Sequence, residues 1–217
     1  NPTGSSIAPD DLRKIHEVVK AHDGVTIIDE IYLGLSYDET YGQTALAIDE
    51  NIISINSFSK YFNMTGWRLG WMVVPDTLVP VIERLAQNLF ICASTVSQHA
   101  ALACFAPESI AEYERRRAEF KARRDYFIPA LEALGMPVPV APDGAFYAWA
   151  DCTQAAQKLG VQGSWDFAYA VMERAHLAIT PGRDFGTVDT ARFVRFSTAN
   201  PMEQLQEAIR RLQKLLG

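Results

Sequence analysis

Two short apolar runs place the strongest limit on the fold. Val25-Thr26-Ile27-Ile28 and Ile52-Ile53-Ser54-Ile55 are rich in β-branched residues and too short for helices, and Trp71-Met72-Val73-Val74 repeats the pattern. Uninterrupted runs of this kind are typical of strands in a sheet covered on both faces. Residues 9–21 instead carry apolar side chains at helical spacing. The first half of the chain therefore predicts an α/β fold.

After Pro75 the apolar pattern becomes mainly helical. The spacing predicts helices over residues 76–92, 96–105, 109–134, 164–176 and 202–216, and strands over 144–149, 178–180 and 192–197. The change in character indicates two domains. We expect residues 1–106 to belong to a larger α/β domain, and residues 107–217 to form a long connecting helix and a smaller α+β domain.

Charge and cysteine content exclude several classes of protein. The 26 acidic residues outnumber the 20 basic ones, for a formal net charge of −6, whereas a general nucleic-acid binder carries the opposite balance. No apolar run approaches the roughly 20 residues that span a bilayer. Three separated cysteines make no disulfide framework, and four histidines show no metal-ligand spacing. We expect no nucleic-acid partner, no membrane span, no metal and a cytoplasmic location.

Reactive side chains follow the first two predicted strands. Asp29 and Tyr32 come after the first strand, and Lys60 comes after the second. Ligands of open α/β sheets bind beyond the carboxyl ends of strands, where these side chains are expected. A lysine in a semi-apolar crevice can lose its proton near neutral pH and condense with an aldehyde. Each residue alone has a commoner explanation, such as a helix cap or an exposed loop lysine.

Groups suited to a phosphate lie close to Lys60 in the sequence. Ser57 and Ser59 supply hydroxyls, and Arg68 in Gly66-Trp67-Arg68-Leu69-Gly70 supplies a planar guanidinium. A lysine, an acid for a ring nitrogen and groups for a phosphate together indicate a phosphorylated aldehyde cofactor. Pyridoxal phosphate fits this description. It is a phosphorylated aldehyde, and its ring nitrogen must stay protonated to withdraw electrons, which requires an acidic partner.

On these motifs, and on Asn1-Pro2-Thr3-Gly4 and Arg192-Phe193-Val194-Arg195-Phe196-Ser197, the whole chain resembles the pyridoxal-phosphate aminotransferases of class I/II. These are the fold type I enzymes of the aspartate aminotransferase superfamily. The resemblance implies that Lys60 forms the aldimine with the cofactor and shuttles the substrate's α-proton. It also implies that Asp29 pairs with the pyridine nitrogen and that Tyr32 hydrogen-bonds the ring oxygen.

Further roles are implied by the same resemblance. Ser57, Ser59 and Arg68 would bind the cofactor phosphate. Asn1 would contact the ring oxygen and the substrate carboxylate, and Arg195 would clamp that carboxylate. As strand residues three apart, Arg192 and Arg195 would lie on opposite faces, and the residues alone do not choose between them. The resemblance selects Arg195.

The implied fold is a partial, mixed and mostly parallel sheet of the large domain, followed by an α+β small domain. Family members carry a further segment before the Asn-Pro-Thr-Gly turn, about as long as half the large domain, so we expect this chain to be the C-terminal portion of an aminotransferase. Apolar faces and a strand edge would then be unpaired. The resemblance also implies a homodimer with shared active sites.

The implied activity moves an amino group between an amino acid and a 2-oxo acid. Two alternatives stay open. A pyridoxal-phosphate carbon–sulfur lyase or related synthase would use the same Lys60, Asp29 and Arg195, and an aminotransferase-like effector domain of a transcription regulator would share the fold. Tyr37, Tyr41 and Phe185 are candidates to line the substrate pocket, although packing explains them equally well. The sequence does not specify which amino acid is bound.

Overall fold

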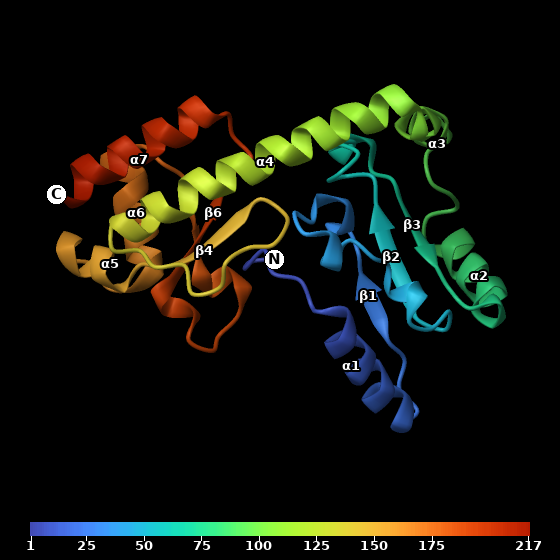
Figure 1. The fold of residues 1–217 in the computed structure, drawn as a ribbon. Coiled ribbons are helices and arrows are strands. Elements are labelled where there is room, and N and C mark those ends of the chain that lie inside the picture. The colour runs from blue at the N-terminus through green and yellow to red at the C-terminus, as the bar shows by residue number, and fades with distance from the viewer. The chain divides into compact units, whose positions relative to one another are not determined.

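The computed structural model describes residues 1–217, which form two compact units (Figure 1). Unit 1 comprises Asn1–Ser6 and Ala118–Gly217, and unit 2 comprises Ile7–Arg117. Helix α4 (Pro107–Ala133) begins in unit 2 and ends in unit 1. The expected domain boundary at 106/107 coincides with the start of α4, whereas the two units divide inside that helix.

Unit 2 contains a three-stranded mixed sheet in the order β1-β2-β3. β1 (Ile27–Asp29) is parallel to β2 (Ile53–Ser57), and β3 (Gly70–Val73) is antiparallel to β2. Helix α1 (Pro9–Ala21) precedes the sheet, and α2 (Val79–Leu89) and α3 (Thr95–Leu102) follow it. Short 3-10 turns lie at Leu33–Leu35, Glu39–Tyr41, Ala45–Ala47, Thr65–Trp67, Asp76–Leu78 and Ala103–Phe105.

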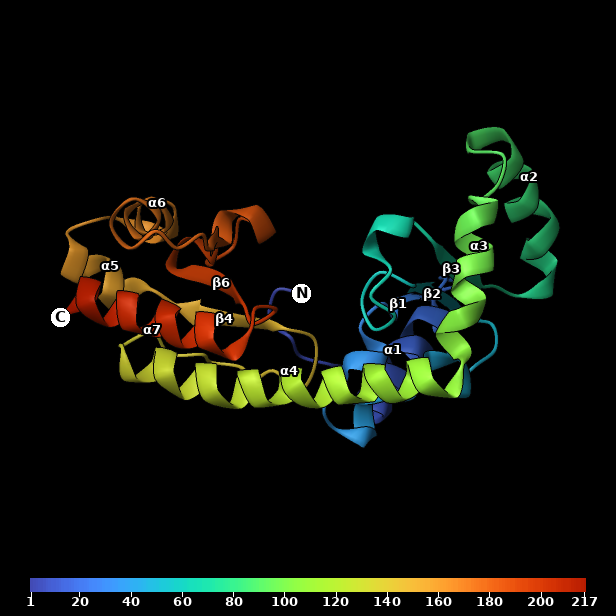
Figure 2. The same ribbon diagram turned by 90° about the horizontal axis from the view of Figure 1, so that it is seen from above.

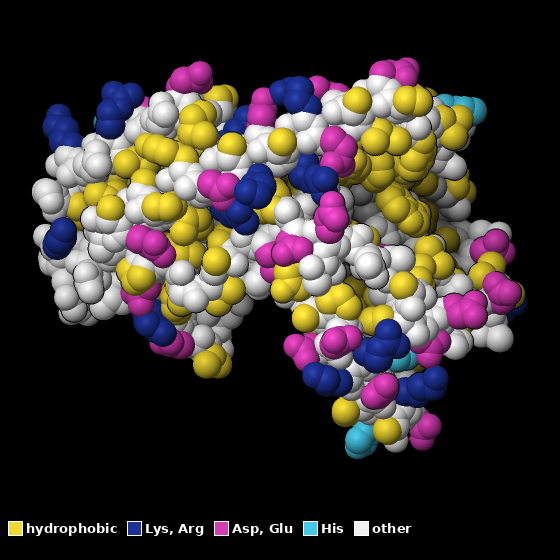
Figure 3. Space-filling view, in the orientation of Figure 1, with side chains coloured by type: hydrophobic (Ala, Val, Ile, Leu, Met, Phe, Trp, Pro, Cys, Tyr) yellow, Lys and Arg dark blue, Asp and Glu magenta, His cyan; other side chains and the backbone are white.

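Only the central strand of this sheet is well buried. Ser54 in β2 is 0% exposed, whereas Ile27 in β1 is 61% exposed and Met72 in β3 is 45% exposed. The expectation of a sheet covered on both faces is therefore wrong for β1 and β3, because side chains that point out of the sheet plane from both strands are exposed. Each is also an edge strand with a single neighbour. The expected unpaired apolar surface is confirmed: α2 has no buried side chain, and hydrophobic side chains gather beside α3 and the start of α4 in Figure 3.

Unit 1 contains an antiparallel sheet in the order β4-β6-β5. Its strands are β4 (Tyr147–Asp151), β5 (Thr180–Pro181) and β6 (Phe193–Ser197). Helices α5 (Thr153–Leu159), α6 (Gly163–Ala175) and α7 (Met202–Leu216) gather around this sheet with the last turns of α4 (Figure 2). Side chains from all four helices and from β4 and β6 form one hydrophobic core. None of the helices in the chain is long and apolar enough to cross a membrane.

The pairing register assigns each side chain of β6 to one of two faces. Val194 and Phe196 lie in the core with Ala148 and Ala150, their partners on β4. Neighbouring residues in a strand point to opposite faces. Arg195, which is paired with Trp149, therefore lies on the face away from that core.

Most predicted elements are present with shifted ends. Helices 9–21 and 202–216 are confirmed as predicted. The first predicted strand begins later, at Ile27, and includes Asp29, and the second extends through Ser57, so both residues end strands rather than follow them. The last predicted strand begins at Phe193, because Arg192 belongs to a preceding 3-10 turn. Helix α5 is not predicted by the pattern.

Candidate functional site

The predicted acid, phenol and amine lie at one edge of the unit 2 sheet. β1 and β2 are parallel with Asp29 in register with Ile55, so their carboxyl ends meet at that edge. Asp29 Oδ1 accepts a hydrogen bond of 3.1 Å from the Ile31 backbone N–H. Lys60 lies in the turn after β2, and its Nζ is 5.9 Å from the centroid of the Tyr32 ring. The structure thus places Asp29 at the end of β1 and brings Lys60 near the ring of Tyr32, which follows that strand.

The three candidate phosphate ligands lie at the end of β2, where Ser57 is its last residue, and in the hydrogen-bonded loop that leads to β3. The Ser59 backbone N–H donates to Ser57 Oγ (3.0 Å), and Thr65 Oγ1 donates to the Ser59 carbonyl (2.6 Å). Arg68 Nη1 donates to the Thr65 carbonyl (2.9 Å). Arg68 has a left-handed backbone with φ of 53°, a conformation that is uncommon for a residue with a side chain. These contacts link Ser57, Ser59 and Arg68 through one chain of hydrogen bonds.

Glu30, which the sequence analysis did not select, fixes the loop that leaves β1. Its side chain is 7% exposed, and its carboxylate accepts hydrogen bonds from Thr44 Oγ1, the Ala45 backbone N–H (2.6 Å), Ser54 Oγ (2.6 Å) and Asn56 Nδ2. A buried charge is stable only when its hydrogen-bonding capacity is met. The sequence signal for Glu30 is its position directly after a predicted strand and next to Asp29.

Unit 1 brings the two candidate carboxylate-binding residues together. Arg195 Nη1 donates to Asn1 Oδ1 at 2.7 Å. The guanidinium carbon is 4.4 Å from the centroid of the Tyr147 ring and 4.7 Å from that of Phe185. Arg195 Nε is buried and has no hydrogen-bond partner. The rings hold the guanidinium in place by cation–π contact.

The N-terminal residues are held on unit 1 by their backbone. The Gly4 carbonyl accepts hydrogen bonds from the backbone N–H groups of Asp143 (3.0 Å) and Gly144 (3.1 Å). The Asp143 carboxylate accepts from the backbone N–H (2.9 Å) and the hydroxyl (2.6 Å) of Ser6. At Gly4, with φ of 71°, a Cβ would lie 2.7 Å from Pro142 Cβ, so only glycine fits there. These contacts anchor the segment that carries Asn1.

Arg192 has different partners. It forms ion pairs with Asp151 (2.7 Å) and with Asp189 (2.8 Å) and is exposed. Both of its negative partners are protein carboxylates, so its charge is already balanced. The residues alone do not choose between the two arginines, but the structure distinguishes them. Arg192 is paired with acids, whereas Arg195 is not.

The donor set of unit 2 fits pyridoxal phosphate. A primary amine (Lys60) suits its aldehyde, a carboxylate with one oxygen still able to accept (Asp29) suits its ring nitrogen, and a phenol (Tyr32) suits its ring oxygen. The hydroxyls and guanidinium of the 57–68 turn suit its phosphate. The structure contains no group of three or more His, Cys, Asp or Glu side chains arranged to hold a metal ion.

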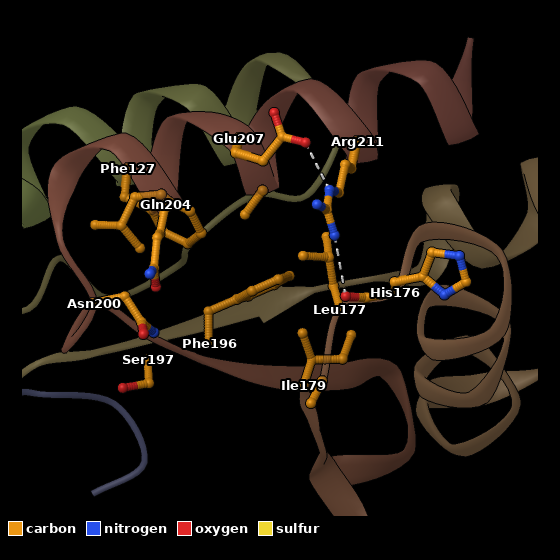
Figure 4. A pocket seen from close by; sticks show the side chains of 13 residues that line it. Phe127, His176, Leu177, Ile179, Phe196, Ser197, Asn200, Gln204, Glu207 and Arg211 are labelled. Atoms are coloured by element: carbon orange, nitrogen blue, oxygen red, sulfur yellow. Dashed lines mark hydrogen bonds and ion pairs between the residues drawn. The ribbon is translucent and has the colours of Figure 1, made fainter.

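A cavity of about 500 Å³ lies elsewhere in unit 1 (Figure 4). Apolar side chains that include Phe127, Ile179 and Phe196 line it, and Arg211 crosses one end, where it donates to Glu207 (2.8 Å) and to the His176 carbonyl (3.4 Å). None of the eight predicted site residues lines this cavity. The candidate chemistry therefore does not depend on it.

The chain has fold type I, the fold of the solved aminotransferases that resemble it. Residues 1–212 match the family described as aminotransferase class I and II, and the chain belongs to this family.

The relatives of this chain include aminotransferases named for different amino acids. Valine-pyruvate aminotransferase of Mycobacterium tuberculosis is 38% identical over 214 residues, which cover 98% of this chain and 54% of the relative. Aspartate aminotransferase of Pyrococcus abyssi is 33% identical over 220 residues, covering 100% of this chain and 55% of the relative. The chain thus spans about half the length of these relatives.

Solved structures show the same extent of similarity. The crystal structure of an aminotransferase from Mycobacterium tuberculosis matches with a TM-score of 0.92 and 38% identity, over 100% of this chain and 55% of that one. The aromatic aminotransferase from Pyrococcus horikoshii matches with a TM-score of 0.89 and 33% identity, over 100% of this chain and 57% of that one.

Proposed function

We propose that this chain carries catalytic residues of a pyridoxal-phosphate aminotransferase that moves an amino group between an amino acid and a 2-oxo acid. The observation that carries the proposal is the meeting of Asp29, Tyr32 and Lys60 at the shared carboxyl end of β1 and β2. Membership of the aminotransferase class I and II family supports the same reaction.

The residues of unit 2 have distinct proposed tasks. When bound, pyridoxal phosphate supplies an aldehyde and a cationic ring that withdraws electrons from the substrate's α-carbon. Asp29 keeps the ring nitrogen protonated by accepting its hydrogen bond, and Tyr32 donates to the ring oxygen. Ser57, Ser59 and Arg68 bind the phosphate. The amine of Lys60 would take the proton from the substrate's α-carbon and pass it to the aldehyde carbon of the cofactor. In the second half-reaction it would move a proton in the opposite direction, to the α-carbon of the new amino acid.

The residues of unit 1 are proposed to bind the substrate carboxylate. The guanidinium of Arg195 contacts two rings and Asn1 Oδ1, so its planar fork is oriented before substrate arrives. Asn1 contacts Arg195 and is proposed to bind the same carboxylate and the ring oxygen. A fixed carboxylate leaves the amino group of the substrate as its reacting end, which converts a loose encounter into an oriented one.

Replacement of Lys60 tests the proposal in the full-length protein that carries this sequence. After incubation with pyridoxal phosphate and reduction with borohydride, mass mapping should place the cofactor on the peptide that contains Lys60. Lys60→Ala should remove this modification and all transamination, whereas Lys158→Ala, which alters an exposed lysine of α5, should change neither. Transamination by the Lys60→Ala variant at the wild-type rate would refute the assignment.

The oxo-acid requirement separates the leading proposal from a carbon–sulfur lyase. An aminotransferase needs an oxo acid to complete its turnover, so product should form catalytically only when pyruvate or 2-oxoglutarate is present. A panel of amino donors against these two acceptors would also reveal the substrate class. Steady release of product without any acceptor would favour the lyase.

We also propose a homodimer in the cytoplasm. Large exposed apolar side chains on α2 and α3, such as Val81, Leu85 and Leu102, are the kind of surface that subunit contacts cover. The three cysteines are free thiols, which suits a reducing compartment. Sedimentation of the full-length protein tests the dimer.

A further inference from the structure

Tyr61, the residue after Lys60, packs directly on the segment that follows Tyr32. A Cβ on Gly34 would lie 2.6 Å from Tyr61 Cγ, so the ring rests on the glycine backbone with no room for a side chain. Gly34 lies in the 3-10 turn Leu33–Leu35, immediately after Tyr32. The ring of Tyr61 therefore sets the spacing between the Lys60 segment and the Tyr32 segment.

Two charged side chains of α4 hold this tyrosine and the same turn. Tyr61 Oη donates a hydrogen bond of 2.6 Å to Glu114 Oε1. Glu114 Oε2 forms a 2.5 Å ion pair with Arg117 Nη2, and Arg117 Nη1 donates to the Ser36 carbonyl at 3.2 Å. Ser36 directly follows the turn that contains Gly34. We refer to Tyr61, Glu114 and Arg117, which are linked by these contacts, as the Tyr61 clamp.

The hydrogen bond from Tyr61 to Glu114 requires a protonated phenol. Burial of the phenol, together with its hydrogen bond to Glu114, raises the pKa of Tyr61 above its ordinary value. The phenol therefore stays protonated near neutral pH and remains a donor to the carboxylate. A hydrogen bond to a charged acceptor is stronger than one between neutral groups, so the ring has a defined position on its polar side as well as on its face.

We propose that the Tyr61 clamp is a positioning device that holds the Lys60 amine against the Tyr32 ring. This inference rests on the proposed function for its catalytic consequence, because Lys60 and Tyr32 act together only in that reaction. No part of the clamp touches substrate in this role. A displacement of about 1 Å at a reacting group can cost about a hundredfold in rate, and loss of one hydrogen bond should permit a smaller displacement.

Hydrogen exchange tests the geometry independently of activity. The full-length protein, with and without pyridoxal phosphate, is compared with Tyr61→Phe, Glu114→Ala and Glu114→Gln. We expect amide exchange in residues 31–36 and 58–63 to rise about tenfold in Tyr61→Phe and Glu114→Ala, since local opening governs exchange. Glu114→Gln keeps an acceptor for the phenol and should restore most of the protection. Glu108→Gln makes the same charge change at an exposed position of α4 and should leave exchange unchanged.

Steady-state kinetics then test the catalytic consequence. Tyr61→Phe should lower kcat about tenfold while the KM for the amino donor changes less than about twofold, because Lys60 acts after the substrate has bound. Glu114→Gln should recover kcat to within about threefold of wild type. The double variant Tyr61→Phe/Glu114→Ala should be no slower than the slower single variant, as expected for residues in one network.

The outcomes separate this inference from the proposed function. Unchanged exchange in both segments of Tyr61→Phe would overturn the clamp, and so would a lower melting temperature with an unchanged kcat, which indicates a structural role alone. A wild-type protein that takes up no cofactor on Lys60 refutes the proposed function instead. The exchange experiment still decides the clamp in that case, because it does not require turnover.

Discussion

Replacement of Arg195 by lysine is the sharpest test of the carboxylate-binding proposal. Lysine keeps the positive charge but lacks the planar fork that allows two parallel hydrogen bonds to a carboxylate. In the structure the guanidinium contacts the rings of Tyr147 and Phe185 and donates to Asn1. The substitution therefore removes a preorganised donor set and leaves the net charge unchanged.

The expected loss follows from the hydrogen bonds involved. A hydrogen bond to a charged group contributes about 1.5–3 kcal/mol. The guanidinium can donate two such bonds to the substrate carboxylate, whereas the lysine ammonium would donate one. Loss of the stacked orientation adds about 0.5–1 kcal/mol. The total of about 2–4 kcal/mol corresponds to a decrease in kcat/KM for the amino acid of roughly 30- to 700-fold.

The neighbouring arginine supplies a matched control. Arg192→Lys makes the same chemical change three residues away, but Arg192 pairs with Asp151 and Asp189 on an exposed face. Exposed ion pairs contribute about 0–1 kcal/mol, so kcat/KM should stay within about fivefold of wild type. Both variants are assayed with an amino acid and, separately, with the corresponding amine that lacks the carboxylate. Only the amino acid should distinguish Arg195→Lys from wild type, and an equal loss with the amine would refute the reasoning.

Three further predictions concern stability. Glu30→Ala leaves several buried donors without an acceptor and should lower the free energy of unfolding by about 3 kcal/mol in urea titrations; a loss below about 1 kcal/mol would contradict the proposed anchoring role. The backbone N–H of Asn51, with a lysine and a histidine of α1, holds the pKa of Asp49 well below its usual range. Its stabilising contribution is present above the unfolded pKa of about 4 and is lost as pH falls below it, so Asp49→Asn should flatten the acid limb of stability against pH. In Gly182→Ala the new Cβ would lie 2.0 Å from the Thr190 carbonyl oxygen, so the melting temperature should fall markedly, and an unchanged value would show that the backbone relaxes freely.

The sequence predicted most long elements, because apolar periodicity over ten or more residues leaves few alternatives. α1 and α7 were predicted to their end residues. Helix α5 escaped prediction since its seven residues complete barely two turns, and its buried side chains are the small Ala155 and Ala156, which give little periodic signal. Such a helix forms because the surrounding core buries it.

The sequence predicts which side chains lie at the sheet edge but not the contacts around them. Strand endings place Asp29 and Lys60 at one edge, so a short-range pattern carries that information. The contacts of Tyr61 with Glu114 and of Arg117 with Ser36 join residues 53 and 81 positions apart. No local pattern encodes them, because they depend on how α4 packs within unit 2.

The two adjacent acids after Ile28 show how one residue of register assigns different tasks to similar side chains. Asp29 ends β1 at the sheet edge, is exposed, and uses only Oδ1 for a local turn. Glu30 points the other way, into the loop, where hydroxyl, amide and backbone donors occupy both carboxylate oxygens. A carboxylate that already accepts so many hydrogen bonds has little capacity for a ligand. Asp29 is therefore the acid of this pair that can still accept a hydrogen bond from a protonated ring nitrogen. Exchange of the two side chains would therefore remove both the anchor and the proposed ligand-binding acid, although composition and charge stay the same.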